Sequence, residues 1–177
     1  MIIQFCGLSG SGKTTLATRA KSYLLDQNIP VEVFDGDEYR KNLFPDLGYT
    51  KEDRHTNIRR LAFVAAKFSQ HNIVSIICAI NPYKAIRQEI GGKYENVKTV
   101  FIKCSIEELL RRDTKGLYKM ALLPDDNTGK IKNLSGINDP FEEPESADLV
   151  IQTDKESIDT SVRKLVTFIE QHTERSR

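Results

Sequence analysis

An eight-residue segment near the N-terminus has the residue types and the spacing of a phosphate-binding loop. Residues 7–14 read GLSGSGKT and satisfy the pattern G-x-x-x-x-G-K-[ST] in full, between an apolar run and a helical pattern. Glycines let the backbone approach phosphate and turn its N–H groups toward it. Lys13 adds a positive charge for the β and γ phosphates, and Thr14 adds a hydroxyl for Mg²⁺. A plain Gly/Ser turn requires neither side chain at these positions, so the segment predicts nucleotide binding.

An acidic turn follows the second apolar run of the chain. Asp35 and Asp37 flank Gly36, and Arg40 lies three residues beyond Asp37, hence on the same face of a helix. A carboxylate here can hold Mg²⁺ through water or accept the proton of an acceptor hydroxyl. An ordinary Asp-Gly turn with a helix cap would have the same residues. Because this turn accompanies a phosphate loop, we favour the functional interpretation.

Arginines and an asparagine form a third group of residues that could bind a ligand. Arg54 and Asn57 share a helix face through their spacing of three, and arginine makes planar bidentate contacts with phosphate or sulfate. The neighbouring arginines 59 and 60 are better explained as a solvated basic turn. For Arg87, a structural role and an acceptor-facing role stay equally open.

Five short apolar runs are predicted to be the strands that bring these groups together. Helical periodicity separates the runs, with apolar faces made by Ile58, Leu61, Ala62, Ala65 and Phe68, and near the C-terminus by Ile158, Val162, Leu165 and Ile169. Such alternation predicts an α/β fold with a parallel five-stranded sheet flanked by helices. Ligands bind beyond the carboxyl ends of such strands, where the chain places Gly7, Asp35, Asn81 and Ser105. The predicted strands are residues 2–6, 31–34, 73–80, 97–103 and 149–152.

The segment from about residue 113 to residue 144 is polar, contains three prolines and has no long periodic helix. A segment of this length without its own core is typically a functional lid or disordered. The 177 residues suit one domain, so we expect a single P-loop kinase domain over residues 1–177 with a lid at about 113–144.

Composition excludes several other classes of protein. The net charge of +1 predicts no nucleic-acid partner, and the absence of a long apolar run predicts no membrane partner. The three cysteines lie apart in apolar runs, which favours buried thiols over disulfides or a zinc site. No guanine-reading Asn/Thr-Lys-x-Asp motif occurs, which argues against a GTPase. With no secretory signal visible at the N-terminus, we expect a cytoplasmic location.

Six segments together resemble the adenylylsulfate kinase family in order and spacing. They read GLSGSGKTT, DGDEYR, LGYTKEDRHTNIRR, NPYKAIR, RRDTKGLYKMA and IKNLSGINDPFEEPESADLVIQT. The resemblance implies a P-loop NTPase fold of the nucleoside-kinase type. It further implies that ATP, with Mg²⁺, phosphorylates the 3′-hydroxyl of adenylylsulfate, giving 3′-phosphoadenylylsulfate and ADP. A small nucleotide acceptor and a homodimer are the partners that it implies.

The resemblance also assigns roles to individual positions. The implied ATP-binding residues are Gly7, Ser9, Gly10, Ser11, Gly12, Lys13, Thr14, Thr15 and Arg112. The implied catalytic residues are Lys13, Asp35, Asp37 and Lys119, and the implied metal ligands are Thr14 and Asp35. The implied acceptor-binding residues are Arg40, Tyr49, Arg54, Asn57, Asn81, Leu134 and Ile137.

The chain departs from the family pattern at four places, all on the acceptor side or in the lid. Asn81 replaces a serine, Leu134 replaces a phenylalanine that is expected to stack on the acceptor base, and Asn138 replaces an aspartate. Residues 122–128 look like a small insertion. The departures suggest two alternatives: the same transfer to another nucleotide such as cytidine diphosphoramidate, an acceptor in capsule modification, or a nucleotide-binding regulatory module without transfer.

Overall fold

The computed structural model describes residues 1–173 and contains one parallel sheet of five strands. The strand order across the sheet is β2-β3-β1-β4-β5. Because β1 is the central strand, the loop that follows it lies in the middle of the row of carboxyl strand ends. This topology confirms the predicted α/β fold. The strands are β1 (Ile2–Cys6), β2 (Val31–Asp35), β3 (Val74–Cys78), β4 (Val97–Lys103) and β5 (Leu149–Gln152).

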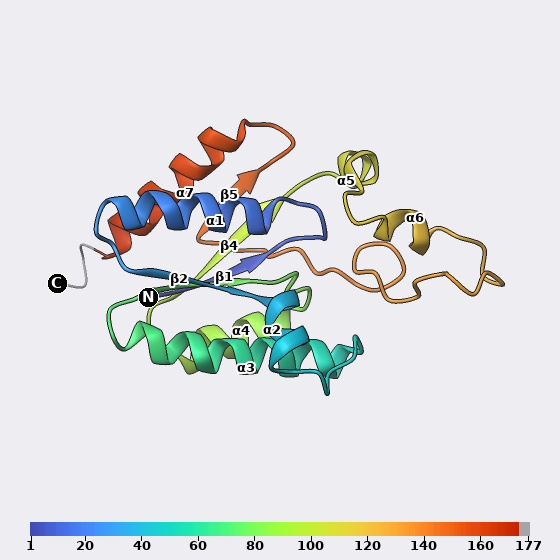
Figure 1. Cartoon of the computed structure of the whole chain (residues 1–177), viewed down its shortest axis with the longest axis horizontal. Helices are drawn as coiled ribbons and strands as arrows, with labels where there is room; N and C mark the ends of the chain where they lie inside the picture. The colour runs from blue at the N-terminus through green and yellow to red at the C-terminus, as the bar shows by residue number, and fades with distance from the viewer. Residues whose placement is uncertain (174–177) are drawn as a thin grey trace.

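Helices cover both faces of the sheet (Figure 1). Helices α1 and α7 pack on one face, and α3 and α4 pack on the other, each pair closing its own apolar core against the strands. Helix α2 follows β2, and the short helices α5 and α6 lie beyond the carboxyl ends of the strands. The helices are α1 (Lys13–Asp26), α2 (Gly36–Asn42), α3 (Lys51–Ser69), α4 (Lys84–Lys93), α5 (Ile106–Arg112), α6 (Leu117–Ala121) and α7 (Ile158–Thr173).

The predicted strands differ from the observed ones only at their ends. Three of the five match, whereas β2 extends one residue further to Asp35 and β3 is shorter at both ends than residues 73–80. The shortening of β3 has a local cause. Beyond Cys78 the chain turns, and Asn81 adopts a left-handed conformation with φ of 48° that ends extended pairing.

The apolar faces of α3 and α7 were predicted correctly except at their ends. Phe68, near the end of α3, is 37% exposed and packs edge-on against Phe34, with ring centroids 5.2 Å apart. Ile158 is the first residue of α7 and is 48% exposed. Terminal turns extend past the sheet, so periodicity overstates burial there.

The predicted lid has more internal packing than its composition suggests. Tyr118, Ala121 and Leu134 are buried in a small apolar cluster with Leu8 and Leu109. The segment shares this cluster with residues outside 113–144, so it packs against the rest of the domain without a separate core of its own. The cluster places the segment directly against the loop that follows β1.

The remaining global predictions concern thiols and membranes. All three cysteines are free and buried, as expected. Across residues 1–173, no helix combines the length and the apolar character needed to cross a membrane.

Candidate active site

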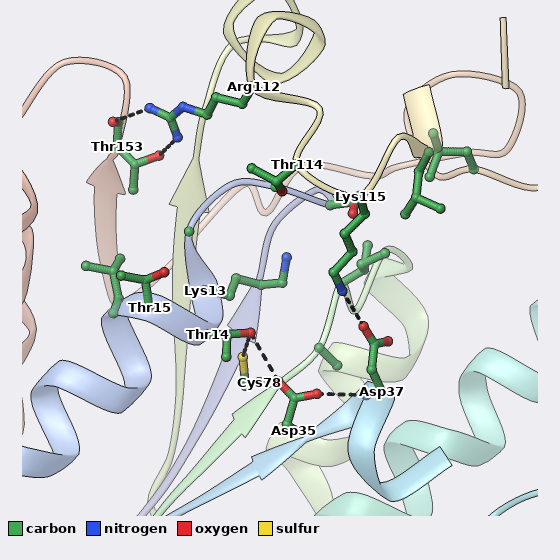
Figure 2. Close-up of a pocket in the computed structure, with 18 of the residues that line it drawn as sticks. Lys13, Thr14, Thr15, Asp35, Asp37, Cys78, Arg112, Thr114, Lys115 and Thr153 are labelled. Carbon is green, nitrogen blue, oxygen red and sulfur yellow. Dashed lines mark hydrogen bonds and ion pairs between the residues drawn. The ribbon is translucent and has the colours of Figure 1, made fainter. Parts of the chain in front are cut away.

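A cavity of about 910 Å³ opens at the carboxyl edge of the sheet. Its walls are the loop after β1, the start of α2, the start of α3, the predicted lid and the β5–α7 connection. Figure 2 shows side chains from these elements converging on this space. Twelve of the predicted site residues line it, namely Ser9, Gly10, Gly12, Lys13, Thr14, Thr15, Asp35, Asp37, Tyr49, Arg54, Arg112 and Leu134.

The loop between β1 and α1 has the backbone of a phosphate cradle. Gly12 precedes α1 with φ of 94°, a conformation that side-chain-bearing residues rarely adopt. Gly7 passes so close to β4 that a Cβ would lie 2.5 Å from the Ile102 carbonyl oxygen. The two glycines thus permit a tight loop. The loop leads directly into the N-terminus of α1, where anions bind favourably.

Lys13 is the first residue of α1, directly after the loop, and is buried. Its ammonium donates to the Leu8 carbonyl at 2.6 Å and approaches the Ser11 hydroxyl at 3.5 Å. Burial lowers the pKa of Lys13. Within residues 1–173, the hydrogen bonds of this buried ammonium go to neutral oxygens. It is therefore a strong site for an anionic ligand, since a phosphate would replace the hydration that burial removes.

Thr14, the residue after Lys13, contacts the acidic turn that follows β2. The Thr14 hydroxyl donates to Asp35 Oδ2 at 3.1 Å and lies 3.6 Å from the Cys78 sulfur (Figure 2). The other carboxylate oxygen of Asp35 accepts the backbone N–H groups of Asp37 and Glu38, which caps α2. Asp35 is therefore fixed by the helix start that it caps, with one oxygen left toward Thr14.

A lysine of the predicted lid reaches the second acidic residue. Lys115 Nζ donates to Asp37 Oδ2 at 2.7 Å, and this carboxylate raises the pKa of Lys115 (Figure 2). Sequence reasoning missed Lys115 because nothing in the local pattern separates it from other lid lysines. The predicted lysine, Lys119, lies on α6 and is not among the residues that line the cavity.

One end of the cavity is organised around Arg112 and Thr153. The Arg112 guanidinium donates to the Thr153 carbonyl at 2.9 Å and to Glu108 at 2.8 Å. Hydrogen bonds from Arg111 and Arg112 lower the pKa of Glu108 to about 2. Thr153 was also missed, although it follows β5 directly and the rule that ligands meet strand ends could have found it.

The other end of the cavity is built from Tyr49, Arg54 and the lid. Arg54 Nε donates to the Tyr49 carbonyl at 3.1 Å, and its Nη2 donates to the Asn133 carbonyl at 2.6 Å. The Tyr49 ring also lies 4.9 Å from the Arg40 guanidinium carbon. Thr50 and Asp53 form a capping box that begins α3 and so fixes the position of Arg54.

Some predicted site residues lie behind the cavity wall. Arg40 lines a neighbouring hollow of about 220 Å³ that shares Asp37 and Tyr49 with the cavity. The Asn81 amide donates to buried Gln4, and its carbonyl accepts from Arg87 at 2.8 Å. The others outside the cavity lining are Gly7, Ser11, Asn57, Ile137 and Lys119. For Arg87, these bonds favour the structural role.

Comparison with known proteins gives a consistent result. A family model described as adenylylsulphate kinase matches residues 1–152. The adenylyl-sulfate kinase of Gloeothece citriformis is 40% identical over 96% of this chain and 93% of its own length. A probable bifunctional SAT/APS kinase of Sorangium cellulosum is 45% identical, but the chain spans only 28% of its length.

Solved structures agree with these sequence relatives. The structure of the Mycobacterium tuberculosis APS kinase CysC in complex with AMPPNP and APS superposes with a TM-score of 0.87 at 32% identity. The superposition covers 96% of each chain. Together with the phosphate loop and its acidic partner, these findings show that this chain belongs to the adenylylsulfate kinase family of phosphotransferases.

Proposed function

We propose that the protein transfers the γ-phosphate of ATP to the 3′-hydroxyl of adenylylsulfate, giving 3′-phosphoadenylylsulfate and ADP. One observation carries the proposal: the phosphate loop, the acidic pair Asp35 and Asp37, and the ring of Tyr49 border one continuous cavity. A donor and an acceptor can therefore meet over the carboxylates without leaving the protein. A related structure is in complex with AMPPNP and APS, which supports a donor and an acceptor nucleotide as the occupants of this cavity.

ATP fits the loop end of this cavity. The loop supplies backbone N–H groups and the Lys13 ammonium for the phosphates. Arg112 and Thr153 lie at the end where the base would bind, beyond Thr15 at the start of α1. The planar guanidinium of Arg112 can stack on a purine, and its bonds to Glu108 and Thr153 hold it in place.

Magnesium fits the pair formed by Thr14 and Asp35. A hydroxyl and a carboxylate oxygen 3.1 Å apart are ligands of the kind that Mg²⁺ takes beside nucleotide phosphates. No cluster of three or more His, Cys, Asp and Glu side chains in residues 1–173 could hold a metal alone. Mg²⁺ would therefore bind together with ATP, where it would neutralise charge on the phosphates.

Asp37 is the candidate for the group that orients or deprotonates the acceptor hydroxyl. It lies at the start of α2, at the mouth of the cavity, and is paired with Lys115. When an acceptor hydroxyl enters, Lys115 could exchange this pairing for the transferring phosphate, which carries the greater negative charge. Lys119 stays a candidate for stabilising the transferring phosphate if the lid moves closer to the phosphate loop.

The lid would exclude water from the transfer. Its apolar cluster already covers the loop through Leu8, and Leu134 and Ile131 face the cavity. Excluding water strengthens the interactions with the phosphates and suppresses hydrolysis of ATP.

A second acceptor, cytidine diphosphoramidate, is compatible with one feature of the cavity. Among the described residues that line it, Tyr49 is the one aromatic residue, and Leu134 offers apolar contact without a second stacking face. A site with one ring discriminates weakly between bases, because stacking accepts any base with a flat face. The 3′-hydroxyl chemistry would be the same with either acceptor.

An acceptor screen tests both candidates. The protein is incubated with Mg·ATP and either adenylylsulfate or cytidine diphosphoramidate, and ADP is measured. Turnover with adenylylsulfate supports the main proposal, and preference for the cytidine compound supports the second. ADP binding without turnover on any acceptor would instead support the regulatory module.

Location and assembly are two further parts of the proposal. We propose a cytoplasmic enzyme and a homodimer, which sedimentation at several protein concentrations would test.

A further inference from the structure

Two hydroxyl groups from outside the phosphate loop hold two of its backbone carbonyls. The first belongs to Tyr118 on α6, whose phenol donates to the Ser9 carbonyl at 2.8 Å. Tyr118 is only 2% exposed, and burial raises its pKa, so the phenol keeps its proton and remains a donor. Its ring packs in the cluster that joins the lid to Leu8. The lid is thus connected to the loop by a hydrogen bond as well as by apolar contact.

The second hydroxyl belongs to Thr153, directly after β5. Its Oγ1 donates to the Ser11 carbonyl at 2.9 Å, with a longer approach of 3.4 Å to the Lys103 carbonyl. The carbonyl of Thr153 accepts a hydrogen bond from the Arg112 guanidinium at 2.9 Å, and the guanidinium also approaches Oγ1 at 3.5 Å (Figure 2). Thr153 therefore touches both the loop and the arginine at the proposed base-binding end.

The geometry of the peptide unit gives these two bonds a consequence for the amides. In a planar trans peptide the C=O of one residue and the N–H of the next point in opposite directions. Residues 1–173 contain no cis peptide. Holding the Ser9 carbonyl therefore orients the N–H of Gly10, and holding the Ser11 carbonyl orients the N–H of Gly12. Gly10 and Gly12 both line the cavity.

The Ser9–Gly10 and Ser11–Gly12 peptides need hydrogen bonds from outside the loop, because each contains the nitrogen of a glycine, which restricts the backbone little. Gly10 and Gly12 have φ of 75° and 94°, and glycine reaches many other conformations at little cost. No backbone N–H within residues 1–173 donates to the Ser9 or Ser11 carbonyl, whereas the Leu8 carbonyl is held by Lys13 and by the Ser11 N–H. The two hydroxyls supply what the loop's own backbone does not.

We infer that Tyr118 and Thr153 are positioning residues that aim the Gly10 and Gly12 amides at the phosphates of the donor nucleotide. The inference rests on the proposed use of ATP at this loop. It adds that the affinity for phosphate depends on hydroxyls contributed by the lid and by β5, and not only on residues 7–14. A purely structural role for the same bonds would alter thermal stability and leave nucleotide affinity unchanged.

The experiment measures ADP binding by calorimetry at 25 °C, in magnesium buffer, for single variants of the full chain. Tyr118→Phe removes only the phenol oxygen, and Thr153→Val replaces the hydroxyl by a methyl of similar size. Each should weaken ADP binding about five-fold, the effect of one lost hydrogen bond. Thr153→Ser keeps the donor and should bind within about two-fold of the unchanged protein.

Matched controls lie away from the cavity. Tyr23→Phe alters an exposed ring on α1, and Thr173→Val removes a hydroxyl that bonds within α7. Both should bind ADP like the unchanged protein. Tripolyphosphate, which has no base, should show the same losses as ADP in Tyr118→Phe and Thr153→Val, because the affected contacts are to phosphate.

The outcomes separate this inference from the proposed function. If folded Tyr118→Phe and Thr153→Val bound ADP and tripolyphosphate within two-fold of the unchanged protein, the inference would be overturned. If Thr153→Ser lost as much as Thr153→Val, the hydroxyl would not be the cause. Failure of the unchanged protein to bind ADP would reject ATP as the donor, whereas ADP binding without acceptor turnover would reject only the proposed acceptor.

Discussion

The two ends of the cavity are built in different ways. At the donor end, the loop is held by β1, α1, buried Lys13 and the bonds from Tyr118 and Thr153. At the acceptor end, the walls are side chains on α2, α3 and the lid, and Tyr49 is 53% exposed. Backbone groups held by a sheet make a precise site for a group common to all nucleotides. Side chains on helix starts and loops can change without disturbing the core, so we expect the choice of acceptor to depend on them.

The departures from the family pattern follow the same division. The donor loop matches its motif in full, whereas Leu134 and Asn138 lie in the lid and Asn81 is buried behind the cavity wall. Asn138 shows how such a change is accommodated. Its amide oxygen accepts the Leu134 N–H at 2.8 Å, and its amide nitrogen donates to the Ile131 carbonyl at 2.6 Å. An aspartate could not donate this second bond.

The largest expected effect comes from removing the charge at the donor end. Lys13→Ala should lower kcat about 1000-fold, because a preorganised charge on the transferring phosphate is lost. Acceptor-dependent ADP release measures the effect, and circular dichroism checks that the variant folds. Retention of more than a tenth of the activity would mean that this lysine does not act on the phosphates.

Asp37→Asn should slow the transfer step, because Asp37 lies between the donor end and the acceptor end of the cavity. We expect kcat to fall about 100-fold, as for loss of a general base, while ADP affinity stays within two-fold. Single-turnover kinetics with a calorimetric ADP titration measure the two quantities. Equal losses in kcat and in ADP affinity would place Asp37 in donor binding instead, and the division between the two ends would need revision.

Lys115→Gln should act mainly at the acceptor end. Loss of its charge should lower kcat/KM for the acceptor about ten-fold, a typical loss for one charged hydrogen bond. Lys93→Gln is a control on α4, since this lysine lines neither the cavity nor the neighbouring hollow. A comparable loss in that control would indicate a general effect of surface charge.

Leu134→Phe should sharpen acceptor choice. A second ring opposite Tyr49 should lower KM for adenylylsulfate about five-fold through base stacking, with KM for ATP unchanged. Leu134→Met controls for size, since methionine fills similar volume without a ring. If both variants behaved alike, contact area and not stacking would control the acceptor site.

The smallest expected effect concerns pH at the donor end. Arg111 and Arg112 lower the pKa of Glu108 to about 2, below its value in an unfolded chain. Glu108 therefore contributes to stability above pH 4–5, and this contribution disappears as the pH falls toward about 2. Glu108→Gln should have a slightly lower Tm at pH 7 and no deficit near pH 2. A deficit that persists at pH 2 would exclude ionisation as its cause.

Sequence reasoning was most successful where chemistry depends on neighbours in the chain. The phosphate loop, the strand that leads into it and the acidic turn after β2 were all predicted from spacing. The acceptor end was harder. Arg54 lines the cavity, but Asn57, one turn later, is buried outside its lining, near Gly36. Sequence spacing gives the shared helix face but not which neighbours cover each residue.

The order of residue types by itself determined the fold class, the loop and its lysine, because these depend on periodicity and on contacts within a few residues. Tertiary structure alone decided that Lys115 pairs with Asp37, 78 positions away, and that Tyr118 and Thr153 hold carbonyls more than a hundred positions earlier. Such bonds depend on where the lid and β5 return to the loop. No local pattern encodes that return, since it results from how the whole chain packs around the sheet.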